Sequence, residues 1–334
     1  MALIFLPVIY MKIFTWHIHG SYLFYLSQGN YTIYIPVTAG KEEGYYGLGS
    51  TFPFGSNVIA VPAEEVRNLS FDCILFQTNK NWLTDQYEIL SEEQRRLPRV
   101  YVEHDPPTRH PTDARHVMDD PDVIMVHVTH FNRLMWWNNS RIVKVIEHGV
   151  TSSPFSWTGE QARGIVVINH LHQRGRKLGD DIFQEVSRRV PLDLIGMGTR
   201  ECGGLGEVLH PALPAFISRY RFFFNPIRYT SFGLAVCEAM MIGLPVVGLA
   251  TTEYPAVIQD GISGFISNDI DHLTDSMRRL VEDKVLAGRI GAAGRKVAEE
   301  KFNIGRFVRQ WEDVFRLAIA QNINNYYENS SIHQ

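Results

Sequence analysis

The sequence predicts an α/β protein made of two doubly wound domains that face each other across a cleft. Three observations support this prediction. The 334 residues, 45% of them apolar, suffice for two hydrophobic cores. Short β-branched runs alternate with helix-like segments, which favours parallel sheets covered by helices. The alternation stops once, at the Gly, Ser and Pro-rich stretch EHGVTSSPFSWTGE, and then starts again.

We expect the first domain to span residues 1–150. Its expected strands are Lys12–His17, Tyr31–Pro36, Asn57–Val61, Asp72–Gln77, Arg99–Glu103, Val123–Val128 and Ile142–Ile146. Helix-like segments between them are Tyr22–Gln28, Lys80–Glu93 and Phe131–Trp137. The Gly-rich segment Ala39–Ser56 is too irregular for a regular element and predicts a surface loop near a site. Met11 is a candidate translation start, since residues 1–10 lack the features of a leader and KIFTWHIHG already reads as a strand and loop.

The second domain is expected at residues 151–315. Its expected strands are Ile165–Asn169, Leu192–Ile195, Arg221–Asn225, Pro245–Leu249 and Gly264–Ile266. Its expected helices are Lys177–Arg189, Leu213–Arg219, Phe232–Ile242 and Tyr254–Gln259. From Asp271 onward, apolar residues recur at helical spacing. Residues 316–334 are expected to form a helix or tail that returns to the first domain.

Charge and cysteine usage exclude several classes of function. A net charge of −4 and scattered basic residues provide no basic surface for nucleic acid. The cysteines Cys73, Cys202 and Cys237 lie far apart, which indicates a reducing, cytoplasmic compartment and no zinc site. His17 and His19 fall on one side of a strand, but no third ligand has useful spacing, so we expect no metal site.

The most informative stretch is Tyr229 to Val247, YTSFGLAVCEAMMIGLPVV. It follows a predicted strand and should deliver a helix N-terminus to the cleft, where such an end suits phosphate. Ser231 is the expected N-cap, and Gly233 leaves room for close backbone approach. Glu238 is the only carboxylate of an apolar helix, and it could accept hydrogen bonds from a ribose diol. The alternatives are that Glu238 pairs within the fold and that Ser231 only caps the helix.

This stretch resembles the donor-binding signature of retaining, nucleotide-sugar-dependent glycosyltransferases of the GT-B fold, family 4 in particular. The GT-B fold consists of two Rossmann-like domains across a cleft. The resemblance implies that Glu238 binds the nucleotide ribose and that the backbone of Ser231, Phe232, Gly233 and Leu234 holds the diphosphate. Glu238 matches the second glutamate of the family's pattern, whereas Thr230 stands where the family has the first, which reaches the hydroxyls of the transferred sugar.

Other segments extend the resemblance. Gly198, in Leu194–Gly198, resembles the family's G-x-G turn under the nucleotide, and Val145–Val150 resembles the segment that closes its first domain. In Ile165–Gly179, Arg174 and then Lys177 are the candidates for stabilising the leaving diphosphate. The alternative is that these basic residues only belong to a solvent-exposed turn before a helix.

The first domain has its own candidates. His104, in the strand-end sequence VEHD, resembles a histidine that contacts the donor sugar, although a structural role is the alternative. Asp105, Arg109 and the loop containing Gly20 are predicted to lie on the acceptor side.

The resemblance implies metal-independent transfer, with retention, from a UDP- or GDP-sugar to a glycan or lipid-linked acceptor in cell-surface polysaccharide synthesis. A nucleotide-sugar 2-epimerase is one alternative, with Glu103, Asp105 and Glu253 as candidate acid/base groups. A degenerate, non-catalytic nucleotide-binding protein is another. Phe131–Trp137 (FNRLMWW) suggests a peripheral membrane contact, but a buried amphipathic helix is the favoured interpretation.

Overall fold

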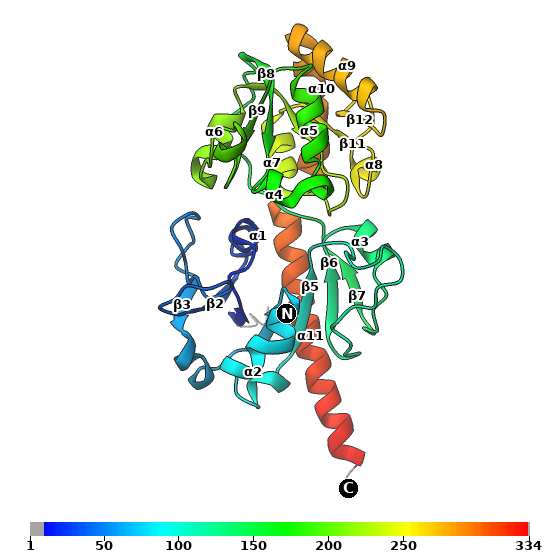
Figure 1. Ribbon diagram of the computed structural model, residues 1–334. Helices are drawn as coiled ribbons and strands as arrows, with labels where there is room; N and C mark the ends of the chain where they lie inside the picture. Colours follow the sequence, from blue (N-terminus) through cyan, green and yellow to red (C-terminus); the bar gives the residue numbers. More distant parts are fainter. Residues whose placement is uncertain (1–9, 333–334) are drawn as a thin grey trace, which may run out of the picture.

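The computed structural model describes the backbone of residues 10–332 and the side chains of residues 10–322. The expectation of a start at Met11 therefore concerns residues that lie mostly outside this range. Two parallel β-sheets occupy successive parts of the chain, and Figure 1 shows them as two bodies, with the second above the first. This arrangement confirms the predicted fold class.

The first sheet has seven parallel strands in the order β3-β2-β1-β4-β5-β6-β7. Their bounds are β1 Met11–Thr15, β2 Tyr31–Val37, β3 Val58–Pro62, β4 Cys73–Phe76, β5 Arg99–Glu103, β6 Ile124–His127 and β7 Val143–Val145. The strand order reverses between β1 and β4, so the loops after these strands diverge. Ligands of doubly wound sheets bind in the crevice at such a point.

The second sheet has five parallel strands in the order β12-β11-β10-β8-β9. Their bounds are β8 Gln161–Val167, β9 Leu192–Ile195, β10 Tyr220–Asn225, β11 Val246–Leu249 and β12 Phe265–Ser267. Every residue of β10 is buried, as expected for a central strand covered by helices on both faces.

Helices cover both sheets. The α-helices are α1 Gly20–Leu26, α2 Gln86–Ile89, α3 His130–Met135, α4 Leu171–Arg174, α5 Asp180–Ser187, α6 Leu213–Ile217, α7 Leu234–Ile242, α8 Tyr254–Val257, α9 Ile270–Glu282, α10 Lys284–Lys301 and α11 Ile304–Ile332. Shorter 3-10 or π turns are η1 Ala63–Asn68, η2 Asn81–Asp85, η3 Gln94–Arg96, η4 Gly175–Leu178, η5 Arg200–Cys202 and η6 His210–Ala212.

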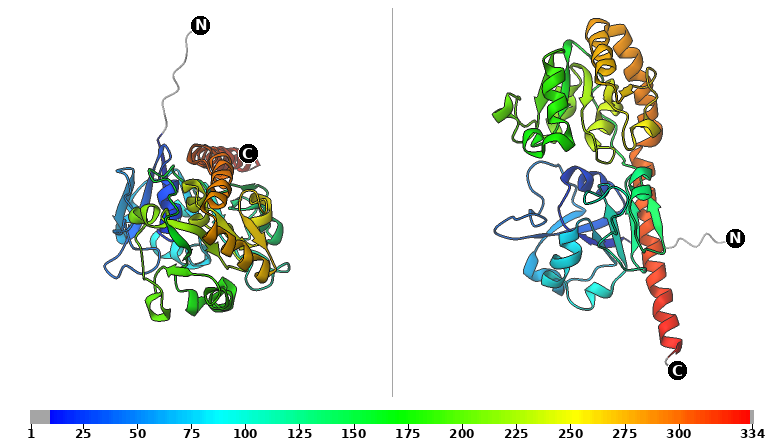
Figure 2. Two further views of the ribbon diagram at one scale, coloured as in Figure 1. Left: turned by 90° about the horizontal axis from the view of Figure 1, so that it is seen from above. Right: turned by 45° about the vertical axis from the view of Figure 1, so that its right-hand side comes forward.

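The long helix α11 follows the second domain in sequence but packs on the first. It contacts α1, β4 and β5, and the right-hand view of Figure 2 shows it running past the first domain. Trp311 is fully buried and donates its indole N–H to Tyr22 Oη at 3.1 Å. Arg306 donates to the carbonyl oxygens of Glu147 and His148 at 2.8 and 2.6 Å. These contacts fasten the chain where it leaves the first sheet.

The helix predicted at Phe232–Ile242 begins two residues later. Gly233, with φ −70° and ψ 146°, is the N-cap of α7, so the prediction that Ser231 caps this helix is wrong. The ring of Phe232 packs in the core, 4.9 Å from the ring of Tyr254 and 5.3 Å from that of Phe302. That packing keeps the segment before Gly233 out of the helix.

The favoured interpretation of Phe131–Trp137 as a buried amphipathic helix is also wrong. The helix there, α3, has only six residues, too few to form a continuous apolar stripe. Leu134 is 80% exposed and Trp137 is 60% exposed. The inward contacts come instead from Thr129, which caps the helix, and from buried Asn132.

Candidate active site between the two sheets

Three adjoining cavities lie between the sheets. The Glu238 cavity, of about 210 Å³, is lined by residues that include Ser21, Phe52, Gly196, Glu207, His210, Leu234 and Glu238. The Ser231 cavity, of about 280 Å³, is lined by residues that include His19, Ser21, His104, Asp105, His148, Ser231, Gly233 and Leu234. The Glu103 cavity, of about 290 Å³, is lined by residues that include His19, Glu43, Gln77, Asn79, Glu103, His104, Asp105 and Trp136. Shared lining residues join them into one cleft.

The N-terminus of α7 faces this cleft. Gly233 and Leu234 both line the Ser231 cavity. A Cβ atom added at Gly233 would meet nothing within 4 Å, so open space lies in front of this residue. The first N–H groups of a helix carry a positive partial charge, which favours an anion at this position.

Glu238 lies one turn into α7 and is 9% exposed. Its Oε1 accepts hydrogen bonds from Tyr25 Oη at 2.7 Å and from His210 Nε2 at 3.0 Å. Among the described residues no group bonds to Oε2, and Glu238 lines the cavity named after it. The carboxylate is thus held by one oxygen and offers the other to a ligand.

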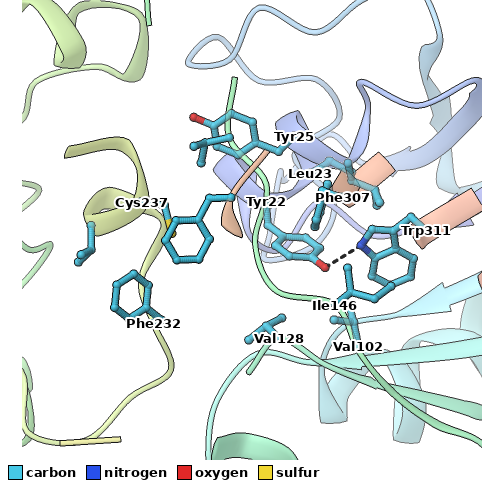
Figure 3. Close-up of a cluster of buried hydrophobic side chains, with 14 of the residues drawn as sticks. Tyr22, Leu23, Tyr25, Val102, Val128, Ile146, Phe232, Cys237, Phe307 and Trp311 are labelled. Carbon is cyan, nitrogen blue, oxygen red and sulfur yellow. Dashed lines mark hydrogen bonds between the residues drawn. The ribbon is translucent and has the colours of Figure 1, made fainter. Parts of the chain in front are cut away.

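Glu238 also joins the two domains. Tyr25 lies on α1 of the first domain, and Figure 3 shows its hydroxyl pointing to the side of the second domain, whereas the hydroxyl of Tyr22 points to Trp311. The ring of His210 lies 4.9 Å from the ring of Phe52 and 5.5 Å from that of Phe24. Phe52 belongs to the segment predicted as a surface loop near a site, and it lines the Glu238 cavity.

Thr230 faces the first domain. Its hydroxyl donates to Asp105 Oδ1 at 3.2 Å. The backbone N–H of Asp105 donates to Glu103 Oε1 at 2.9 Å, and its carbonyl oxygen accepts from Trp136 Nε1 at 2.8 Å. The loop after β5 therefore holds Asp105 in place where the Ser231 and Glu103 cavities meet.

Three histidines surround this meeting point, and burial keeps them neutral at pH 7. Burial, with His19 and His148 adding to it, holds the pKa of His104 well below its usual value. Burial lowers the pKa of His148 to about 4. Burial also lowers the pKa of His19, although the carboxylates of Asp105 and Glu103 oppose this. His104 shares a 3.2 Å hydrogen bond with Gln77 Oε1, so it can present a neutral imidazole to the cleft.

Neither basic candidate, Arg174 or Lys177, is among the residues that line the three cavities. Arg174 ends α4, and Lys177 lies in the turn η4; both side chains are exposed. The charge of Arg174 contributes to lowering the pKa of His19, which places it near the first domain. Arg176, in contrast, pairs with Asp181 at 2.5 Å.

The remaining predicted site residues are Gly20, Gly198 and Arg109. Gly20 begins α1, and a Cβ there would lie 2.3 Å from Phe52 Cε2, so glycine is needed for the loop to pack. Gly198 has φ +69°, and a Cβ there would lie 2.6 Å from His170 Nδ1. Arg109 is exposed in its loop, one residue beyond Thr108, which lines the Glu103 cavity.

Sequence reasoning missed Tyr25 and His210. Tyr25 and Glu238 are 213 positions apart, so no local pattern could pair them. Ser21, which belongs to the loop predicted around Gly20, lines two of the cavities. Among the described residues no cluster of three or more His, Cys, Asp or Glu side chains is arranged to hold a metal ion.

Comparison with solved structures identifies the architecture. Sucrose-phosphate synthase from Thermosynechococcus elongatus superposes with a TM-score of 0.68 at 13% identity, over 92% of this chain and 98% of that one. The Anabaena protein Alr3699/HepE, in complex with UDP and glucose, gives 0.65 at 13% identity, over 92% and 100%. The fold is GT-B.

Sequence comparisons add a family signal to the GT-B fold. Residues 181–283 match the model described as glycosyl transferases group 1, a segment that includes Thr230 and Glu238. O-antigen chain mannosyltransferase B of Escherichia coli is 34% identical over 137 residues, which are 40% of this chain and 32% of that protein. D-inositol 3-phosphate glycosyltransferase of a Nocardioides species is 37% identical over 98 residues, 29% of this chain and 21% of that protein.

These matches relate the chain to glycosyltransferases, chiefly through its second domain. The chain spans between a fifth and a third of the length of these two curated relatives. No helix among residues 10–332 has the length and apolar content needed to cross a lipid bilayer.

Proposed function

We propose that the protein is a glycosyltransferase that moves a sugar from a UDP- or GDP-sugar to a glycan or lipid-linked acceptor. The observation that carries this proposal is Glu238, a buried carboxylate whose Oε1 is occupied and whose other oxygen is available to the Glu238 cavity. A buried carboxylate is costly without hydrogen-bond donors, and ribose hydroxyls are suitable donors. The solved structures that share the fold include one bound to UDP and glucose.

The diphosphate is assigned to the N-terminus of α7. Open space in front of Gly233 lets the phosphate oxygens approach the backbone. The nucleoside then extends into the Glu238 cavity, and the sugar extends into the Ser231 cavity beside His104.

We further propose metal-independent transfer with retention of configuration. Arg174 and Lys177, which make no side-chain ion pair with another described residue, would stabilise the charge that develops on the leaving diphosphate. The neutral imidazole of His104 would hydrogen-bond to the transferred sugar. In a same-face displacement, the leaving phosphate itself accepts the proton of the incoming hydroxyl.

The acceptor is assigned to the Glu103 cavity. Asn79, Glu103 and Trp136 give it the polar groups and the aromatic surface that a glycan requires. We propose a role in cell-surface polysaccharide synthesis at the cytoplasmic face of a membrane. Exposed Leu134 and Trp137 supply apolar surface for a peripheral contact there.

The epimerase alternative is less well supported by the geometry. It requires acid and base groups on either side of a sugar ring. Glu103 is engaged by His116 Nε2 at 2.9 Å, and Glu253 accepts from the backbone N–H of Phe131 at 2.8 Å. Of the three candidate carboxylates, only Asp105 lines the Ser231 cavity.

The test is the variant Glu238→Ala, with Glu201→Ala as an exposed control in the same domain. A hydrogen bond to a charged group is worth roughly 1.5–3 kcal/mol, so we expect nucleotide affinity to fall roughly 10- to 100-fold. Calorimetry with UDP and GDP measures this, and unchanged affinity would refute the ribose role. Incubating the wild type with UDP- and GDP-sugars across an acceptor panel separates transfer from epimerisation and from binding without turnover.

A further inference from the structure

Asp105 occupies a particular place in the cleft. It is the one carboxylate among the described lining residues of the Ser231 cavity, and it also lines the Glu103 cavity. It therefore lies where the two cavities meet, together with His19 and His104.

Hydrogen bonds orient the side chain of Asp105, but they do not occupy both of its carboxylate oxygens among the described residues. Its backbone is held from both sides, by Glu103 and by Trp136. Oδ1 accepts the Thr230 hydroxyl at 3.2 Å, and no described group bonds to Oδ2. Thr230 belongs to the second domain, so this contact turns a first-domain carboxylate toward the donor side of the cleft.

The described side chains that line the Ser231 cavity beside Asp105 include no permanently charged base. His104 and His148 stay neutral because burial lowers their pKa values. No lysine or arginine is among the described residues that line the Ser231 cavity. A carboxylate in this position is stabilised by hydroxyl donors, and a sugar ring supplies several.

We propose that Asp105 binds a hydroxyl of the transferred sugar, and that Thr230 orients it for this purpose. The carboxylate that binds the sugar thus belongs to the first domain and extends into the cleft from that side. The preferred donor carries a neutral, hydroxylated sugar, because a negatively charged one would be repelled. This inference rests on the proposed function, since it takes the Ser231 cavity to hold the sugar of a nucleotide sugar.

One consequence distinguishes Asp105 from a residue that merely supports the fold. In the proposed function the nucleotide contacts Glu238 and the N-terminus of α7, and Asp105 is not among the residues that line the Glu238 cavity. Loss of the Asp105 charge should therefore weaken binding of the nucleotide sugar and leave binding of the free nucleotide unchanged.

The experiment compares UDP and GDP with UDP-glucose, UDP-galactose, UDP-N-acetylglucosamine and GDP-mannose by calorimetry. With the best of these donors, Asp105→Asn should raise the Kd for the nucleotide sugar roughly tenfold while the Kd of the free nucleotide changes less than twofold. Asp113→Asn, at an exposed position of the same loop, is the control and should change neither Kd. Equal effects of Asp105→Asn on both ligands, or no effect on either, would overturn the inference.

A second variant tests the position of the charge. Thr230 and Asp105 meet at 3.2 Å, so a carboxylate at either position reaches the same hydroxyl. The double variant Asp105→Asn/Thr230→Glu should recover most of the lost affinity, whereas Thr230→Glu alone places two carboxylates together and should weaken binding. A double variant no better than Asp105→Asn would overturn the shared-hydroxyl assignment. A wild type that binds no nucleotide at all would instead refute the proposed function, and this inference with it.

Discussion

Replacing His127 should make the protein more resistant to acid. His127 is the last residue of β6 and is fully buried, and neither of its ring nitrogens has a hydrogen-bond partner. Burial is the main cause that lowers its pKa from 6.5 to about 3, and the charges of His116 and Arg133 lower it further. The ring is therefore neutral in the folded protein at any pH above about 3.

The size of the effect follows from the two pKa values. The unfolded chain binds a proton at His127 below about pH 6.5, and the folded protein does so only near pH 3. Stability is therefore lost as the pH falls through 6.5, by about 1.4 kcal/mol for each pH unit once the unfolded form is charged. Between pH 7 and pH 5 this single ring costs about 2 kcal/mol of unfolding free energy.

The variant His127→Leu removes this titration and keeps an apolar side chain in the buried site. Urea unfolding at pH 7 and pH 5, followed by tryptophan fluorescence, measures the difference. Four of the six tryptophans lie within residues 16–137, so the signal reports mainly the first domain. The wild type should lose about 2 kcal/mol more than the variant between these pH values.

The exposed residue His130, three positions later, provides the control variant His130→Leu, which should keep the pH dependence of the wild type. An identical pH dependence for wild type and His127→Leu would refute the reasoning. That result would show that His127 titrates alike in the folded and unfolded protein.

Two further predictions concern packing and the junction between the domains. Tyr25→Phe removes a hydrogen-bond donor from the buried carboxylate of Glu238 and should lower the unfolding free energy by roughly 1.5–3 kcal/mol. The control is Tyr31→Phe, which should lower it by about 1 kcal/mol, because the Tyr31 hydroxyl donates to the neutral carbonyl oxygen of Leu26. Equal losses of the two variants in urea unfolding would contradict a charged Glu238. Gly291→Ala places a Cβ 2.0 Å from the carbonyl oxygen of Gly243, so it should lower the melting temperature even though alanine has the better helix propensity. An unchanged melting temperature would contradict this prediction.

Local patterns in the sequence were enough to predict the two parallel sheets. Runs such as Arg221–Asn225 and Arg99–Glu103 are buried strands, because a strand covered on both faces must be almost wholly apolar. The strand-end rule then indicated which loops reach the cleft, and it selected Asp105 and Gly233.

Local patterns failed where distant packing decided the backbone. Ser231 has the side chain of a good N-cap, but the buried ring of Phe232 moves the helix start to Leu234. The apolar letters of FNRLMWW suggested burial, but α3 is too short to cover Leu134. In the first case a tertiary contact outweighed a local N-cap preference of about 1 kcal/mol.

By itself the sequence determined which residues could carry the chemistry, because the α7 segment has one carboxylate and the loop before it has Thr230 where a charge was expected. Only the tertiary structure decided what these residues touch. Glu238 meets Tyr25 and Thr230 meets Asp105 across a cleft, from positions 213 and 125 residues away. The physical reason is that a hydrogen bond depends on atoms lying about 3 Å apart, and only the packing of the two domains brings these atoms together.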